Sequence, residues 1–155
     1  MTTPQFSPFV LVVDDEEPDQ EQIKRALDRY GVPCQAVPRA FEAIAYLKRE
    51  GAFADARRPT LVLLDWKLPG TGLAVLRTIR ESKELCAIPV VVLSRSDAAA
   101  DVTAAYTSFA NAFVKKKMDL NEFHQQLSSI CELFLRVALL PGAGSQPEPL
   151  CQPSR

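Results

Sequence analysis

Four short apolar runs along the chain each end at a polar side chain. They are residues 9–13 before Asp14 and Asp15, residues 61–64 before Asp65, residues 90–93 before Ser94, and residues 112–114 before the lysines at 115–117. Continuous runs of valine and leucine of this length are typical of strands buried on both faces, as in a parallel sheet. Ligands of open parallel sheets bind at the carboxyl ends of the strands. The pattern therefore predicts that these polar residues meet at one edge of one sheet.

Segments with helical periodicity separate these runs. The last of them has the clearest apolar stripe, preceded by Asp119 and Glu122 in the spacing of a capping box: Leu120, Phe123, Leu127, Ile130, Phe134 and Val137. We expect Ser96 or Asp97 to cap the helix before it, which carries Val102, Tyr106 and Phe109. A further short strand over Cys34 to Val37 is expected near a sheet edge. Strands that alternate with helices predict an α/β fold of (βα)5 type, a three-layer sandwich with a parallel sheet.

Length and composition fit one soluble domain. The chain has 155 residues and a formal net charge of −1, which gives no bulk attraction to nucleic acid or to a membrane surface. Neither a membrane-spanning run nor a signal peptide is found in the sequence, so we expect a cytoplasmic protein. The expected organisation is an N-terminal segment over 1–7, a domain over 8–140, and a disordered tail over 141–155 that is rich in Gly, Pro, Ser and Gln.

The cysteines do not indicate a metal site. Cys34, Cys86, Cys131 and Cys151 are scattered without a CxxC pair, and the chain has a single histidine. A zinc site would need closer spacing and histidine partners, so we expect reduced thiols.

The polar residues at the predicted sheet edge suit phosphoryl transfer. Asp14, Asp15 and Asp65 would gather negative charge that favours a bound cation, and magnesium prefers such carboxylate ligands. An aspartate can attack phosphorus, while a lysine neutralises charge and a hydroxyl donates to a phosphoryl oxygen. The acids could instead be only an acidic helix start, which the helix dipole favours. Trp66, beside Asp65, is either a packing residue or a partner contact.

These motifs together resemble the response regulator receiver domain, a chemotaxis-regulator type of flavodoxin-like fold with strand order 2-1-3-4-5. The matching segments are Val-Val-Asp14-Asp15-Glu, Leu-Leu-Asp65-Trp-Lys-Leu-Pro69, Ile-Pro-Val-Val-Val-Leu-Ser94 and Phe113-Val-Lys-Lys116. The resemblance implies that Asp65 is the phosphoacceptor. It implies that Asp14, Asp15, Asp65 and the backbone carbonyl of Lys67 hold Mg²⁺. Ser94 and Phe113 would take the switch positions, and the aromatic-x-x-Lys pattern selects Lys116 as the phosphoryl-binding lysine.

A narrower resemblance is to single-domain regulators of bacterial phytochrome histidine kinases, carried by residues 88–96, by residues 111–120 and by the long loop before residue 61. Two departures touch the loops around the site. Lys117 stands where the family often has proline, and the turn Pro69-Gly70-Thr71-Gly72 is one residue shorter than the common form and lacks its Asp-Gly pair.

The resemblance implies a signalling switch, not an enzyme, that takes a phosphoryl group from a sensor histidine kinase. Three alternatives remain: a degenerate receiver that acts as a scaffold, a flavodoxin-like cofactor binder, and an aspartate-nucleophile phosphatase. Acids after the first strand would repel a cofactor phosphate, and a phosphatase would have an acid where Lys67 stands. We also expect a homodimer through the fourth helix, fifth strand and fifth helix, because that region has surplus apolar residues: Tyr106, Phe109, Leu133, Leu135, Leu139 and Leu140.

Overall fold

The computed structural model describes residues 7–141, so most of the expected N-terminal segment and nearly all of the expected tail lie outside the described residues. The strands are β1 (Val10–Val13), β2 (Cys34–Val37), β3 (Leu61–Asp65), β4 (Val90–Ser94) and β5 (Ala112–Lys115). The helices are α1 (Glu17–Arg29), α2 (Ala40–Lys48), α3 (Gly72–Glu81), α4 (Ala99–Thr107) and α5 (Leu120–Glu132). A short 3-10 turn covers Gly51–Phe53, and a π-helical turn over Leu133–Val137 extends α5.

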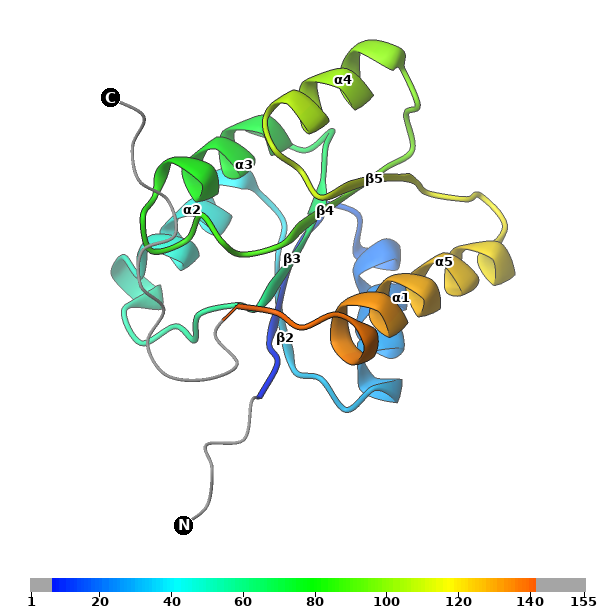
Figure 1. Cartoon of the computed structure of the whole chain (residues 1–155), viewed down its shortest axis with the longest axis horizontal. Helices are drawn as coiled ribbons and strands as arrows, with labels where there is room; N and C mark the ends of the chain where they lie inside the picture. The colour runs from blue at the N-terminus through cyan, green and yellow to red at the C-terminus, as the bar shows by residue number, and fades with distance from the viewer. Residues whose placement is uncertain (1–6, 142–155) are drawn as a thin grey trace.

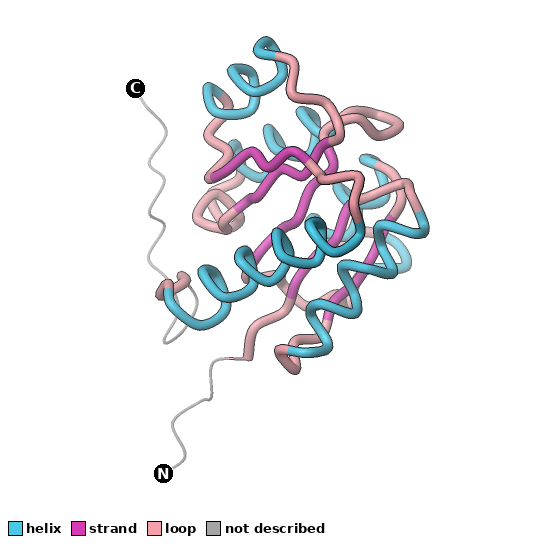
Figure 2. The backbone as a smooth tube through the Cα atoms, turned by 90° about the vertical axis from the view of Figure 1, so that its right-hand side faces the viewer, coloured by secondary structure: helices cyan, strands magenta, loops and turns pink. Residues whose placement is uncertain are grey.

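The five strands form one parallel sheet, as the sequence pattern predicted, and their order β2-β1-β3-β4-β5 is the one that the resemblance implied. Helices α1 and α5 lie side by side on one face, and α2, α3 and α4 cover the other (Figures 1 and 2). Every residue of β1, β3 and β4 is buried, which explains why these strands lack any polar alternation. The edge strand β2 is only partly buried.

Each face of the sheet has its own apolar core. Alternate strand residues such as Leu11 and Val62 face α2 and α3, while Val12 and Leu63 face α1 and α5. Trp66 belongs to the first of these cores and is 7% exposed, so its place in the fold is that of a packing residue.

Helix α4 is the least embedded helix of the domain. Of its residues, all of which are described, Ala105 is the buried one. Its N-cap is Ala98 without a side-chain cap, so the expected capping by Ser96 or Asp97 is wrong; the Ser96 hydroxyl instead accepts a bond from the Ala98 amide at 3.3 Å. Phe109 lies beyond the helix end, at a φ of 71°, and is exposed. Few buried contacts therefore hold this helix to the sheet.

Only the middle of the apolar stripe predicted for helix α5 is fully buried. Asp119 caps this helix, since its carboxylate accepts a bond from the Glu122 amide at 2.9 Å. Phe123, Leu127 and Ile130 are buried, but the two ends of the stripe, Leu120 and Val137, are exposed. Val137 lies in the π-helical turn, where the helical period changes.

The apolar surplus near α4 and α5 is partly used by the core. Tyr106, Phe109, Leu133 and Leu139 are exposed, the last at 96%. Leu140 is buried and Leu135 packs against the core, so the expectation of an outward-facing side chain is wrong for these two.

The cysteines differ in their redox state. Cys34 and Cys131 are free thiols, but Cys86 is disulfide-bonded, so the expectation of reduced cysteines is wrong for Cys86. Cys151 lies outside the described residues. Within residues 7–141, no helix is long and apolar enough to cross a membrane.

Candidate functional site

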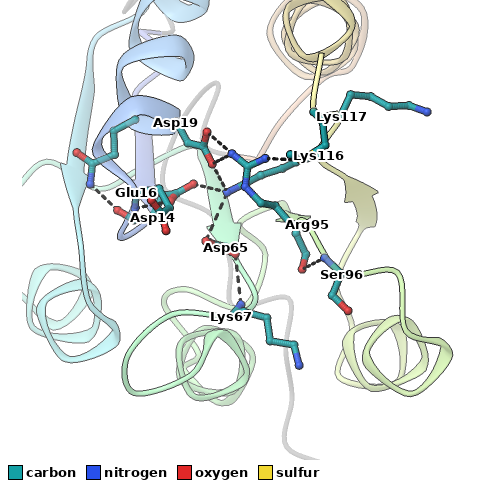
Figure 3. A network of polar contacts seen from close by, with 12 residues as sticks. Asp14, Glu16, Asp19, Asp65, Lys67, Arg95, Ser96, Lys116 and Lys117 are labelled. Atoms are coloured by element: carbon teal, nitrogen blue, oxygen red, sulfur yellow. Dashed lines mark hydrogen bonds and ion pairs between the residues drawn. The ribbon is translucent and has the colours of Figure 1, made fainter. Parts of the chain in front are cut away.

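The predicted acids meet where two neighbouring strands end. Asp14 follows β1 directly and Asp65 is the last residue of β3, and the pairing of Val13 with Leu64 sets them side by side. Asp14, Asp15 and Asp65 each offer a carboxylate oxygen, and these oxygens lie within 4.8 Å of one another. Asp14 and Asp65 are buried, whereas Asp15 faces solvent. Figure 3 shows the two buried acids close together at the base of the site.

Local backbone contacts orient the two buried carboxylates. One oxygen of Asp14 accepts a bond from the Glu16 amide at 2.9 Å, and one oxygen of Asp65 accepts from the Lys67 amide at 3.3 Å. Burial raises the pKa of Asp65 to about 6, with the nearby Asp14 adding to the rise and Lys116 opposing it. Burial likewise raises the pKa of Asp14. Two crowded, desolvated carboxylates with one exposed neighbour form a donor set that suits a hard divalent cation.

Lys116 brings positive charge into this cluster. Its ammonium lies 2.6 Å from Asp14 Oδ2, 3.0 Å from Asp19 Oδ2 and 3.4 Å from Asp65 Oδ2. Its amide donates to the Ser94 carbonyl at 2.7 Å, which fixes the start of the loop after β5 against the end of β4. Burial lowers the pKa of Lys116, but attraction to Asp14 and Asp65 outweighs it, so the net direction is upward. Lys116 is therefore a fixed cation beside the predicted phosphoacceptor.

The neighbouring lysines lie outside the cluster. Lys115 is exposed and pairs with Asp97 at 2.9 Å, and Lys117 is also exposed. The Lys117 amide donates to the Gln126 side chain at 3.0 Å, a bond that proline at this position could not make. The departure from the family pattern thus has a local structural partner in α5.

The predicted switch residues, Ser94 and Phe113, lie in strands β4 and β5. Ser94 is fully buried at the end of β4, and its hydroxyl oxygen accepts a bond from the Ser96 amide at 3.2 Å. Phe113, in β5, is half-buried against the core on the α4 side, and its amide donates to the Tyr106 hydroxyl at 3.1 Å. The structure therefore links Phe113 to helix α4 through Tyr106, and within the described residues neither predicted switch side chain has a hydrogen bond to the carboxylates.

The turn after Asp65 is shaped by a close approach of α3. A Cβ atom at Gly72 would lie 2.6 Å from the Asp65 carbonyl oxygen, so no side chain fits there. Thr71 takes a positive φ of 67° and caps α3 through its hydroxyl, which accepts from the Ala74 amide at 3.3 Å. The shortened turn still delivers Lys67 to the edge of the site, where its ammonium pairs with Asp101 at 3.2 Å.

Two residues of the site were missed by the sequence reasoning. Asp19, in the first turns of α1, is 5% exposed and binds Lys116 as well as Arg95, whose guanidinium lies 2.8 and 3.0 Å from its two oxygens. The sequence patterns assigned no role to either residue. The sequence did hold one signal for Asp19. It lies five positions after Asp14, among the helix residues that face the sheet.

These side chains surround one open pocket of about 320 Å³, lined by Asp15, Glu16, Asp65, Lys67, Arg95, Ser96 and Lys116. A larger hollow of about 730 Å³ lies at the far end of α3, but its half-buried cation, Arg80, already donates to three backbone carbonyls and to the Asn111 side chain. The smaller pocket has the carboxylates, the ammonium and the access to solvent that phosphoryl transfer requires.

Comparisons with known proteins agree with this geometry. The model of the response regulator receiver domain matches residues 10–128. The chain is 30% identical over 137 residues to the response regulator Rcp1 of Synechocystis sp., covering 86% of this chain and 93% of that protein. The crystal structure of the phosphorylated cyanobacterial phytochrome response regulator RcpA superposes with a TM-score of 0.85 at 35% identity, covering 88% of this chain and 100% of that one. The Mn²⁺-bound form of Rcp1 gives 0.84 at 29% identity, over 87% and 99%.

Proposed function

Because this chain belongs to the response regulator receiver domain family, we propose that Asp65 accepts a phosphoryl group from a sensor histidine kinase. The observation that carries the proposal is the cluster at the end of β1 and β3: a buried carboxylate within 4.8 Å of two others, with a lysine ammonium 3.4 Å from it. In the proposed step an oxygen of Asp65 attacks phosphorus, the bond between phosphorus and the donor histidine nitrogen breaks, and the electron pair leaves with the imidazole.

Each neighbouring group has a defined part in this proposal. Asp14, Asp15 and Asp65, with the Lys67 carbonyl, would hold Mg²⁺, which when bound neutralises charge on the transferring phosphoryl group. Lys116 is held beside Asp65 by the carboxylates of Asp14 and Asp19 and offers a point charge to the phosphoryl oxygens. The acids that would bind the metal are intact and assembled, which argues against a degenerate scaffold. Their charge disfavours a flavodoxin-like cofactor site.

We propose that Ser94 and Phe113 couple phosphorylation to the surface around α4. The Ser94 hydroxyl could exchange its bond with the Ser96 amide for one to a phosphoryl oxygen. Ser96 in turn bonds Asp101 in the first turn of α4, and Phe113 is tied to Tyr106 in the same helix. Since α4 has a single buried residue, a small rearrangement at its start can shift the whole helix.

Two partners follow from this proposal. Similarity to a cyanobacterial phytochrome response regulator supports a bacteriophytochrome-type histidine kinase as the phosphoryl donor. A second copy of this chain would cover the exposed apolar residues around α4, β5 and α5, where Tyr106, Leu133 and Leu139 are at least about half exposed. Such a dimer would give the α4 surface an occupant that phosphorylation can regulate.

Labelling by a small acyl-phosphate donor tests the proposal. The full chain is incubated with the donor and Mg²⁺, and the modified residue is mapped by mass spectrometry. We expect one phosphoryl group on Asp65, none in Asp65→Asn, and normal labelling in Asp97→Asn, a matched variant of an exposed aspartate at the same sheet edge. Labelling of Asp65→Asn, or a site mapped elsewhere, would refute the assignment.

A further inference from the structure

A salt bridge at one side of the pocket has no role in the proposal above. The Arg95 guanidinium, from the loop after β4, binds both oxygens of Asp19, from α1. The two residues are 76 positions apart in the sequence. Figure 3 shows the Arg95 side chain lying across the site in front of Lys116. Arg95 also lines the same pocket as Asp65.

The two partners differ in freedom. The Asp19 side chain is 7% exposed and is held from two sides, by Arg95 and by Lys116. The Arg95 side chain is 48% exposed, and among the described residues its other hydrogen-bond partner is a weak acceptor, the Met118 sulfur at 3.4 Å. The guanidinium can therefore leave its partner, whereas the Asp19 carboxylate is buried and fixed against Lys116.

Arg95 lies where its guanidinium could bind a phosphoryl group on Asp65. Asp19 Oδ2 is shared by Arg95 and Lys116, each at 3.0 Å, so the guanidinium and the ammonium are near neighbours. A guanidinium binds two oxygens of a phosphoryl group at once, which the ammonium cannot do. Arg95 also directly follows Ser94, so any movement of Ser94 toward the phosphoryl group carries its backbone along.

Resting on the proposed function, we propose that Arg95 is a second phosphoryl-binding cation of this site. Asp19 is the positioning residue that holds Arg95 at the side of the pocket before phosphorylation and competes with the phosphoryl group for it. The Asp19–Arg95 pair is neutral as a whole, so it adds no net charge to the resting pocket. On phosphorylation the guanidinium exchanges one anionic partner for a stronger one, and no covalent step is added.

The test uses beryllium fluoride, a mimic of the phosphoryl group, and the full chain saturated with Mg²⁺. Calorimetry gives its affinity for the parent chain, Arg95→Gln, Asp19→Asn and the double variant. We expect Arg95→Gln to weaken binding by about three- to tenfold. The parent gains one charge-assisted contact to the mimic but gives up the Asp19–Arg95 salt bridge, so only the difference between the two is lost in the variant. Asp19→Asn should strengthen binding by a similar factor, because it releases Arg95. The double variant should match Arg95→Gln alone.

Opposite signs separate this role from a structural one, because loss of a merely structural salt bridge would weaken binding in both single variants. Arg58→Gln, which breaks the exposed pair with Glu84 away from the pocket, is the matched control and should bind like the parent. Unchanged affinity in Arg95→Gln would overturn the proposal, and so would an Asp19→Asn effect that persists without Arg95, since it would then act through Lys116. Should Asp19→Asn not fold, the exposed Arg95→Gln still decides. A parent chain that is never labelled on Asp65 would refute the proposed function instead.

Discussion

The buried carboxylate of Asp65 should destabilise the metal-free protein at neutral pH. The pKa of this group rises from 3.8 to about 6 on folding, chiefly because burial disfavours the charged form. The folded state therefore binds the Asp65 proton more tightly than the unfolded state does. The stability contributed by this group is fully present below pH 3.8 and is lost as the pH rises through about 6.

The magnitude follows from the size of the pKa difference. A rise of this size corresponds to roughly 3 kcal/mol of unfolding free energy lost at pH 7.5, with the attraction of Lys116 already included. Asp65→Asn removes the charge and keeps the shape and the bond from the Lys67 amide. We therefore expect this variant to be more stable than the parent chain by about 1–3 kcal/mol at pH 7.5 in chelator.

Urea denaturation at several pH values measures this effect. The stabilisation by Asp65→Asn should move the midpoint by roughly 1 M urea at pH 7.5 and should shrink toward zero below pH 4. Saturating Mg²⁺ should cancel it, because the parent chain gains binding free energy that the variant loses in part. Asp97→Asn is the control, since the Lys115 hydrogen bond lowers the pKa of Asp97 and its pH dependence should have the opposite sign.

Two results would refute this reasoning. An Asp65→Asn variant that is no more stable than the parent at pH 7.5 in chelator would mean that Lys116 fully compensates the buried charge. A stabilisation of equal size at pH 3.5 and pH 7.5 would mean that the effect comes from packing and not from ionisation.

Three further predictions concern the metal, the switch and the dimer. Chelation should abolish labelling of Asp65, and Mg²⁺ should change the fluorescence of the adjacent Trp66 in the parent chain but not in Asp15→Asn; full labelling in chelator would contradict the role of the acids. Ser94→Ala should still be labelled on Asp65 but should lose the phosphorylation-dependent change in hydrogen exchange of α4; a normal change would place the switch elsewhere. Light scattering at micromolar concentration should give a dimeric mass that falls to the monomer in Leu133→Glu with Leu139→Glu, and a monomeric parent chain with and without phosphorylation would rule the dimer out.

The local pattern of the sequence was enough to predict a parallel α/β sandwich and the acids at its edge, while the strand order came from the family resemblance. Buried parallel strands must be apolar at every position, so β1, β3 and β4 stand out from the helices between them. A parallel sheet has one carboxyl edge, and any polar residue that ends such a run must lie there. Asp14 and Asp65 were therefore predicted to meet at this edge, although they are 51 positions apart in the sequence.

Contacts between elements could not be predicted in this way. Asp19 lies in α1 and Arg95 in the loop after β4, and nothing local to either residue indicates that they pair. The same holds for Leu140, which is buried after the π-helical turn has changed the phase of α5, and for Ala98, which takes the place of a side-chain cap at α4. Periodicity records which side of an element is buried, whereas pairing across the fold depends on distances that exist only after the elements have packed.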